Sequence, residues 1–211
     1  MNRSKVCSIL FTFVISLALT TVAFPLTITK GPYLQNAAAN SIVVMWETDE
    51  ASDSRVDFGA TTSYGHNVYS SALTKTHQVA VTGLTTDTLY HYKVTSKTAA
   101  ATKTSADNTF RSAPAYATPF RFVAYGDSRS YPDIHAEVVA GIVTAAPRLV
   151  LHTGDFTNDG ITAADWQTDY FAPAAPLIKN TPLYPVLGNH EENAALYYQY
   201  FSPPAGGGDY G

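Results

Sequence analysis

Apolar and polar residues alternate in short runs through the first half of the chain, and turn-forming residues separate the runs. Alternation with a period of two is typical of strands with one buried face, and no run here shows helical spacing. Strands at this spacing, with no helices between them, predict an antiparallel sandwich with Trp46 in its core. Gly83 and Leu84 followed by Tyr90 indicate a tyrosine corner, in which the hydroxyl ties two strands of a sandwich together. The expected strands cover residues 41–47, 55–59, 77–81, 89–94 and 109–111.

The pattern changes at about residue 120, where strands and helices begin to alternate. Pro132 suits the first turn of the first helix, because its missing N–H is not needed there. Strand–helix–strand units predict a largely parallel sheet whose ligands bind at the carboxyl ends of the strands. Farther on, Tyr197, Tyr198, Tyr200 and Phe201 have helical spacing and are expected to pack in the core. The expected strands cover residues 121–125, 148–152 and 183–187, and the expected helices cover 133–145 and 163–171.

A stretch rich in proline and alanine, residues 113–119, separates the two patterns. Such a composition is typical of a domain boundary. We therefore divide the chain into a signal peptide at 1–23, an all-β sandwich at 24–113, a linker at 114–119 and the first part of an α/β domain at 120–211.

The amino terminus has the order of features that is typical of a secretory signal peptide. Arg3 and Lys5 precede an apolar run at residues 6–22, and the small Ala23 follows it. We expect cleavage after Ala23 and a secreted or periplasmic protein with no membrane contact. The alternative is an uncleaved anchor, because the run approaches the roughly 20 residues that span a bilayer. The only cysteine, Cys7, lies in this run, so the mature chain is expected to contain no disulfide.

The overall charge argues against a nucleic-acid partner. The chain has a formal net charge of −4 and a pI of about 5.8, and 45% of its residues are hydrophobic. A protein with this balance has no basic surface for a polyanion and has enough apolar residues to build a core.

Each of three successive strands in the α/β part ends in a glycine that is followed by an oxygen-bearing residue. Glycine lets the backbone turn sharply off a strand end and approach an ion or a phosphate closely. The separations, 28 residues from Asp127 to Asp155 and 34 from Asp155 to Asn189, each fit one strand–helix–strand crossover. Two carboxylates and an amide oxygen at one sheet edge suit a pair of cations. A single Gly-Asp dipeptide, by contrast, is more often part of an ordinary turn than a metal ligand. The three motifs are Gly126-Asp127-Ser128-Arg129, Gly154-Asp155 and Gly188-Asn189-His190-Glu191.

The ordered motifs resemble those of the calcineurin-like metallophosphoesterase superfamily. The preceding strands are similar to the fibronectin type III-like domain of purple acid phosphatases, so the resemblance covers roughly residues 24–211. It implies that Asp127 binds one metal ion, Asp155 bridges two, and Asn189 binds the other, the ions being iron, zinc or manganese. It also implies that His190 contacts the substrate phosphate and assists the leaving group. The implied activity is hydrolysis of a phosphorylated small molecule by the full-length secreted protein.

The chain departs from the family pattern at three places. Arg129 stands where most members have a histidine, and Asn158 stands where purple acid phosphatases have a tyrosine ligand. The family also completes its site with later histidines, and none follows His190, so we expect an incomplete sequence with an unburied apolar sheet face. Arg129 has two open interpretations, a bidentate contact to substrate phosphate or an ion pair with Glu137, Asp133 or a neighbouring loop.

The histidines other than His190 are not expected to bind metal. His66, His77 and His91 have irregular spacing on strands, which is typical of surface positions. His152 precedes the second motif and is expected to pack beneath it. His135 lies on a predicted helix and is expected to be solvated.

Two functions of different classes remain open. The first is metal-dependent hydrolysis of phosphate esters, which the intact aspartates, asparagine and histidine of the motifs favour. The alternative is a non-catalytic exported module in which the sandwich binds a surface or a sugar and the phosphatase part is degenerate.

Overall fold

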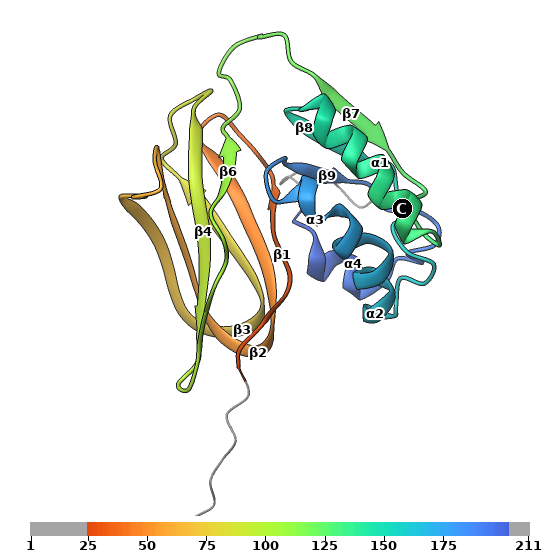
Figure 1. The fold of residues 1–211 in the computed structure, drawn as a ribbon, viewed down its shortest axis with the longest axis horizontal. Coiled ribbons are helices and arrows are strands. Elements are labelled where there is room, and N and C mark those ends of the chain that lie inside the picture. The colour runs from red at the N-terminus through yellow and green to blue at the C-terminus, as the bar shows by residue number, and fades with distance from the viewer. Residues whose placement is uncertain (1–24, 203–211) are drawn as a thin grey trace, which may run out of the picture.

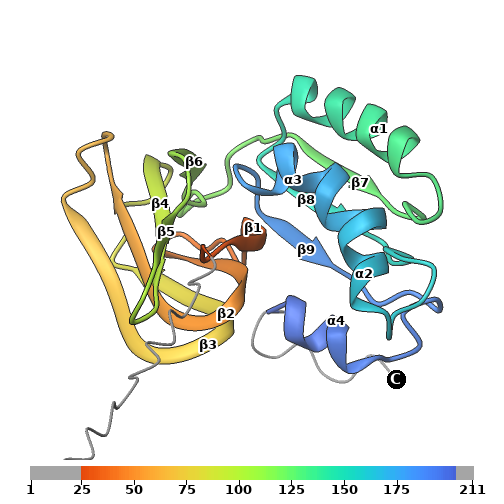
Figure 2. The same cartoon turned by 60° about the horizontal axis from the view of Figure 1, so that its bottom comes forward.

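The computed structural model describes residues 25–202, which form a β-sandwich and an α/β part side by side (Figures 1 and 2). A connection that runs from the end of the sandwich to the first strand of the α/β part joins the two. The predicted signal peptide at 1–23 lies outside the described residues, as do the residues after Ser202. Within the described range, every helix is too short or too polar to span a bilayer.

The sandwich is built from long strands that pass from one sheet to the other. The expected strands at 41–47 and 55–59 are one strand, β2, whose first half pairs with β1 and the second half of β3. Its second half pairs with the first half of β3 and with β4, while β5 and β6 pair with β4. The strands are β1 (Ile28–Gln35), β2 (Ser41–Gly59), β3 (His66–Thr82), β4 (Leu89–Lys97), β5 (Thr102–Thr104) and β6 (Asn108–Arg111). This distribution over two sheets is the fibronectin type III-like sandwich that the strand spacing predicts.

Strand β1 was not expected, because Gly31 and Pro32 interrupt its alternating pattern. The pairing of β1 with β2 shifts register between Lys30 and Tyr33, so the strand continues past the interruption as a bulge. The alternation of apolar and polar residues is interrupted here, but the pairing of β1 with β2 continues on both sides of the interruption.

The core of the sandwich contains the residues that the sequence places there. Trp46 is fully buried, and its indole N–H donates a hydrogen bond to Ser96 Oγ at 2.9 Å. The backbone N–H of Thr85 donates to the Tyr90 hydroxyl at 2.8 Å, so the predicted tyrosine corner is confirmed. A single hydrogen bond therefore fastens the turn before β4 to the strand itself.

One sandwich histidine lies in the core, and the expectation of a surface position for His77 was wrong. Its ring stacks on Trp46 with centroids 4.6 Å apart and has no exposed surface. The Thr48 hydroxyl lies 2.9 Å from Nε2 and the Ser54 hydroxyl 2.7 Å from Nδ1, so both ring nitrogens have partners. Burial lowers the pKa of His77 to about 4, because the charged ring would lose its hydration. His66 is exposed and His91 is half-buried beside Asp107, 2.8 Å away.

The α/β part contains a parallel sheet, as predicted, and its strands lie in the order β9, β8, β7. Helices α1 and α3 lie together on one of its faces (Figures 1 and 2). The helix expected at 163–171 is longer, because Pro173 occupies the first turn of α3, where proline is tolerated. The elements are β7 (Phe122–Tyr125), α1 (Pro132–Ala145), β8 (Leu149–His152), α2 (Ala163–Asp165), a π-helix (Trp166–Phe171), α3 (Ala172–Ile178), β9 (Leu183–Pro185) and α4 (Ala195–Tyr200).

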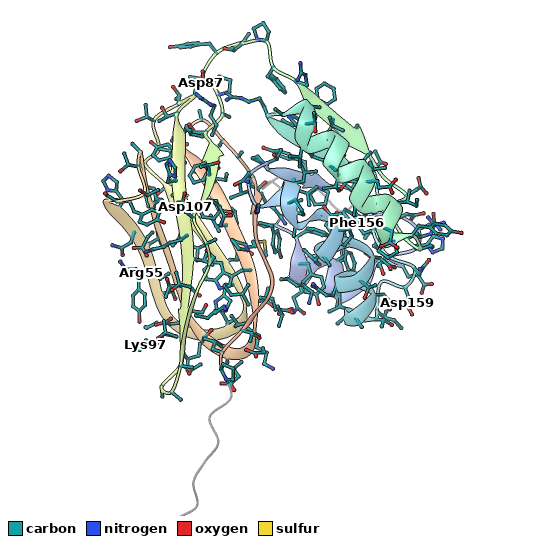
Figure 3. All side chains as sticks on the ribbon, in the orientation of Figure 1. Arg55, Asp87, Lys97, Asp107, Phe156 and Asp159 are labelled. Atoms are coloured by element: carbon teal, nitrogen blue, oxygen red, sulfur yellow. The ribbon has the colours of Figure 1, made fainter. Side chains whose placement is uncertain are left out.

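Aromatic side chains fill the core of the α/β part, around Phe156 (Figure 3). Tyr197, Tyr200 and Phe201 are buried there as expected, whereas Tyr198 is 55% exposed. The short helix α4 packs only one face against the core, and Tyr198 lies on the other face.

The two parts share one sheet, which the sequence did not indicate. Strand β1 pairs with β9 in parallel at Gln35 and Leu183, so the sandwich sheet continues into the α/β sheet. The side chain of Gln35 is fully buried and accepts a hydrogen bond from the Ser202 N–H at 2.6 Å. The hydroxyl of Tyr33 donates to the carbonyl oxygen of Tyr200 at 2.8 Å. Buried polar contacts therefore cross the boundary between the parts.

The sheet face opposite α1 remains open among the described residues. Phe122 is 53% exposed and Leu151 36% exposed, whereas their strand neighbours Val150 and His152 are buried. Alternate strand residues point to opposite faces, so one face carries the core and the other is the unburied apolar face that was expected.

Candidate functional site at the carboxyl ends of the parallel strands

The three strand-end motifs meet at one edge of the sheet. The Asp127 N–H donates to the Gly154 carbonyl at 3.1 Å, and the Ser128 N–H donates to the Asp155 carbonyl at 3.1 Å. The His190 N–H donates to Asp155 Oδ1 at 3.2 Å, which joins the third motif to the second. Residues that are 63 positions apart in the chain are thereby fixed within one cluster of turns.

Glycine is required in these turns because the three backbones nearly touch. A Cβ on Gly188 would lie 2.2 Å from the Asp155 nitrogen, and one on Gly154 would lie 2.6 Å from the Gly188 backbone. A Cβ on Gly126 would lie 2.1 Å from Thr153 Oγ1. The motif glycines thus permit a close approach that any larger residue would prevent.

The aspartates that follow two of these glycines have left-handed backbone conformations. The φ angle is 52° at Asp127 and 57° at Asp155. Residues other than glycine rarely adopt this region, and such strain gathers at functional sites where the surroundings enforce it. The turns thus aim both carboxylates off the strand ends.

A buried glutamate, Glu191, holds the second and third turns together. Its Oε1 accepts the Phe156 N–H at 2.7 Å, and its Oε2 accepts the N–H groups of Asp155 at 3.0 Å and Gly188 at 2.8 Å. The residue has no exposed surface. Sequence analysis gave it no role, although its place at the end of the third motif was the available signal.

Arg129 forms ion pairs with both motif aspartates. Its Nη1 lies 2.8 Å from Asp155 Oδ2 and 3.2 Å from Asp127 Oδ1. Of the ion-pair partners that were expected, Glu137 and Asp133 are not used. Arg129 pairs instead with Asp127 of its own motif and with Asp155 in the neighbouring loop. The Asp127 side chain is 79% exposed, that of Asp155 only 11%.

Asn189 and His190 lie beside Asp155 at the surface. Among the described residues, the Asn189 side-chain amide has no hydrogen-bond partner, so its oxygen is available to a ligand. His190 Nδ1 lies 3.2 Å from the Asn158 carbonyl oxygen, which can only accept, so Nδ1 carries the proton. The other ring nitrogen, Nε2, is left available.

His152 packs beneath the site, as expected. Its ring stacks on Phe156 with centroids 3.7 Å apart and is fully buried. The Gly154 N–H donates to Nδ1, so Nε2 carries the proton and donates to Ser128 Oγ at 3.0 Å. Burial lowers the pKa of His152 well below its ordinary value, and the neutral ring supports the first two turns.

His135 is also buried, and the expectation that it is solvated was wrong. It shares the inner face of α1 with Val139 and Ile142, and its Nδ1 donates to the Asp169 carbonyl oxygen at 2.8 Å. Burial lowers its pKa as well. The Asp169 carboxylate accepts the Asn158 N–H at 3.2 Å, so Asn158, at the position of the family's tyrosine, helps to fix its own loop.

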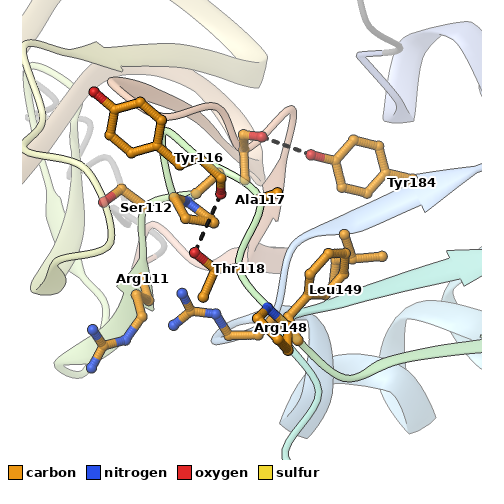
Figure 4. Close-up of a pocket in the computed structure, with 13 residues that line it drawn as sticks. Arg111, Ser112, Tyr116, Ala117, Thr118, Arg148, Leu149 and Tyr184 are labelled. Atoms are coloured by element: carbon orange, nitrogen blue, oxygen red, sulfur yellow. Dashed lines mark hydrogen bonds between the residues drawn. The ribbon is translucent and has the colours of Figure 1, made fainter.

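A cavity among the described residues lies away from these groups. It has a volume of about 680 Å³ and lies at the boundary between the two parts, beside Tyr116, Arg148 and Tyr184 (Figure 4). A hollow of about 120 Å³ lies beside Asp127 and Arg129. We place the chemistry at the strand ends because the carboxylates of Asp127 and Asp155, with their strained backbones, converge there with Asn189 and His190.

The donor atoms fit one cation better than two. Asp155 has carboxylate oxygens, and Asn189, which precedes the His190 N–H that donates to Asp155, has an amide oxygen; donors of these kinds suit a hard or borderline cation. Between Asp127 and Asp155, however, the structure has the guanidinium of Arg129. The described residues contain no group of three or more His, Cys, Asp or Glu side chains that could hold a metal ion.

The family comparison agrees with this geometry. Residues 120–210 match the family model described as calcineurin-like phosphoesterase. This part of the chain is similar to calcineurin-like phosphoesterases. The expected family is thereby confirmed for the segment that carries all three motifs, and the family is one of phosphoester hydrolases.

Solved structures extend the likeness to the fold of both parts. The structure of PhoD has a TM-score of 0.57 and 14% identity, and the match covers 82% of this chain and 40% of PhoD. At this identity the likeness shows the fold alone, and this chain spans about two fifths of PhoD. Two human fibronectin type III domains also match. That of the KIAA0970 protein has a TM-score of 0.34 and 19% identity, and the match covers 44% of this chain and 77% of that chain. That of fibronectin type III domain containing protein 3 has a TM-score of 0.35 and 17% identity, and the match covers 46% of this chain and 94% of that chain. No curated protein matched the chain.

Proposed function

We propose that the full-length protein to which this chain belongs is an exported, metal-dependent hydrolase of small-molecule phosphate esters, acting as a phosphomonoesterase or phosphodiesterase. The observation that carries the proposal is the convergence of Asp127, Asp155, Asn189 and His190 at one sheet edge, within a calcineurin-like phosphoesterase domain. An edge of this kind is where ligands of parallel α/β sheets bind. Iron, zinc or manganese are the candidate cations.

The groups of the chain have distinct tasks in this proposal. Asp155 and Asn189 would hold a cation, and a bound cation would supply positive charge to the phosphoryl group during transfer. Arg129 uses only Nη1 in its ion pairs, and its Nε–H and Nη2–H groups have no acceptor among the described residues, so they are free to bind phosphate oxygens. The Asn158 carbonyl oxygen holds Nδ1–H of His190, and the doubly protonated ring would donate its Nε2 proton to the leaving-group oxygen.

The experiment that tests the proposal measures hydrolysis of p-nitrophenyl phosphate and bis-p-nitrophenyl phosphate by the purified full-length protein with added Mn²⁺, Zn²⁺ or Fe²⁺. We expect Asp155→Asn to lower kcat at least about 100-fold, because the cation loses its main anionic ligand. His190→Ala should lower kcat with little change in KM, and Arg129→Lys should raise KM several-fold, because lysine lacks the planar donor fork. Glu50→Gln, an exposed change of the same charge in the sandwich, is the matched control.

Metal-independent hydrolysis, or equal rates in wild type and Asp155→Asn, would refute the catalytic proposal. Absence of hydrolysis with every metal would favour the alternative, a non-catalytic exported binding module. Mass determination of the mature amino terminus tests export separately, since a chain that still begins at Met1 would contradict signal cleavage.

A further inference from the structure

The charges around Arg129 determine how many cations this site can hold. The same guanidinium nitrogen contacts Asp155 Oδ2 at 2.8 Å and Asp127 Oδ1 at 3.2 Å. These are the two carboxylates that would have to share a first cation. A guanidinium is always protonated in proteins, so the space between the carboxylates already contains a positive charge.

The surrounding contacts keep the guanidinium in that place. The Ser128 N–H is bonded to the Asp155 carbonyl, and Ser128 Oγ is bonded to His152, so the turn that carries Arg129 is fixed to the second motif. The Arg129 side chain is only 26% exposed. A divalent cation between the same carboxylates would meet a like charge at close range in a partly desolvated setting, which is unfavourable.

The opposite side of Asp155 has no such charge. Asp155 Oδ1 faces the third motif, where it accepts the His190 N–H, and the neighbouring Asn189 amide has no partner among the described residues. Carboxylate oxygens have about four lone-pair sites, so Asp155 can bind a cation on this side while it keeps Arg129 on the other.

We propose that Arg129 is a built-in cation that replaces the first metal ion, so that this chain binds one metal ion, at Asp155 and Asn189, instead of two. The inference rests on the proposed phosphoesterase function. It makes the site a mixed centre, in which one ion and one guanidinium together face the substrate phosphate. In this arrangement Asp127 holds Arg129 in position and does not bind metal.

The test is a count of bound Mn²⁺ by equilibrium dialysis and elemental analysis, with electron paramagnetic resonance to detect spin-coupled Mn²⁺ pairs. We expect one ion per chain and no coupled signal for wild type, and the same for Arg129→Lys, which keeps the charge. Arg129→Ala should bind two ions with a coupled signal. The double variant Arg129→Ala with Asp127→Asn should return to one, whereas Asp127→Asn alone should stay at one.

Circular dichroism confirms that each variant is folded before its metal is counted. A wild-type chain with two ions or with none would overturn the inference, as would an Arg129→Ala chain that still binds one. Hydrolysis assays remain separate: one bound Mn²⁺ without hydrolysis would contradict the proposed function only, and two bound ions with hydrolysis would contradict the inference only.

Discussion

At the scale of single residues, the site depends on side chains that touch no ligand. Glu191 accepts backbone hydrogen bonds from two turns, and His152 supports the first turn through Ser128. Buried polar groups such as these are stable only while each has its partners. Two predictions concern residues of this kind.

Removal of the Glu191 carboxylate should destabilise the fold strongly. Glu191→Ala leaves the N–H groups of Asp155, Phe156 and Gly188 buried without acceptors, which we expect to lower the free energy of unfolding by about 4 kcal/mol. Glu191→Gln keeps one acceptor oxygen and should have about half that effect. Urea unfolding followed by circular dichroism measures both. Glu192→Ala, at the exposed neighbour, should stay within about 0.5 kcal/mol of wild type, and a similar loss there would contradict the explanation.

His77 should make the protein less stable as the pH falls from about 6.5 to about 4, the ordinary and folded values of its pKa. Within this range the unfolded chain binds a proton that the folded chain does not, so acid favours unfolding. Between pH 7 and pH 5 the expected contribution is about 2 kcal/mol.

Replacement of His77 by glutamine should remove that part of the pH dependence. The measurement is the free energy of unfolding by urea at pH 7 and pH 5 for wild type and for His77→Gln. His135 and His152 have pKa values shifted in the same direction, so some dependence should remain. An exposed control, His66→Gln, should behave as wild type, and an unchanged difference in His77→Gln would disprove the prediction.

At the scale of elements, the turns after β7, β8 and β9 form a single unit. Gly154 and Gly188 lie against the backbone of each other's turns, and Gly126 lies against the Thr153 side chain, so a change of shape in one turn must move another. The nearest neighbours of Gly154 and Gly188 are backbone atoms, which cannot move aside as the end of a side chain can.

One added methyl group in this unit should therefore be more harmful than the same change in a helix. Gly188→Ala places Cβ 2.2 Å from the Asp155 nitrogen and should lower stability by about 3 kcal/mol. Gly141→Ala lies in the exposed part of α1 with nothing within 4 Å, and should raise stability by up to about 1 kcal/mol because alanine favours helix. Thermal unfolding of the two variants compares them directly. Equal changes in stability for the two variants would show that the turns can rearrange to accept the added methyl group.

At the scale of the whole molecule, the sandwich and the α/β part are joined by one sheet and by buried hydrogen bonds. Strands β1 and β9 pair, Gln35 and Tyr33 bond to the residues around Tyr200, and the Tyr92 hydroxyl donates to the Lys179 carbonyl at 2.6 Å. Separation of the parts would expose these polar groups and the aromatic side chains beside them.

We therefore expect the two parts to unfold together. The sequence contains two tryptophans, and both are fully buried, Trp46 in the sandwich and Trp166 in the α/β part. Trp166→Phe leaves a reporter for the sandwich, and Trp46→Phe leaves one for the α/β part. In each variant, fluorescence and far-ultraviolet circular dichroism should give the same urea midpoint. Two separated transitions in either variant would show that the parts are independent.

The sequence by itself determined the two kinds of architecture, the family and the residues of the strand-end motifs. Period-two alternation and strand–helix alternation are local patterns, and glycine before an oxygen ligand marks a turn wherever it occurs. The tyrosine corner at Tyr90 and the packing of His152 followed from the same local reasoning.

Only the tertiary structure decided which groups meet. The burial of His77 and His135 depends on hydroxyl and carbonyl partners supplied by other elements. The bridging of two aspartates by Arg129 and the role of Glu191 depend on three turns approaching within hydrogen-bond distance. The pairing of β1 with β9 depends on the packing of one part against the other. Contacts between distant residues follow from the folded backbone as a whole, and no local pattern of polarity encodes them.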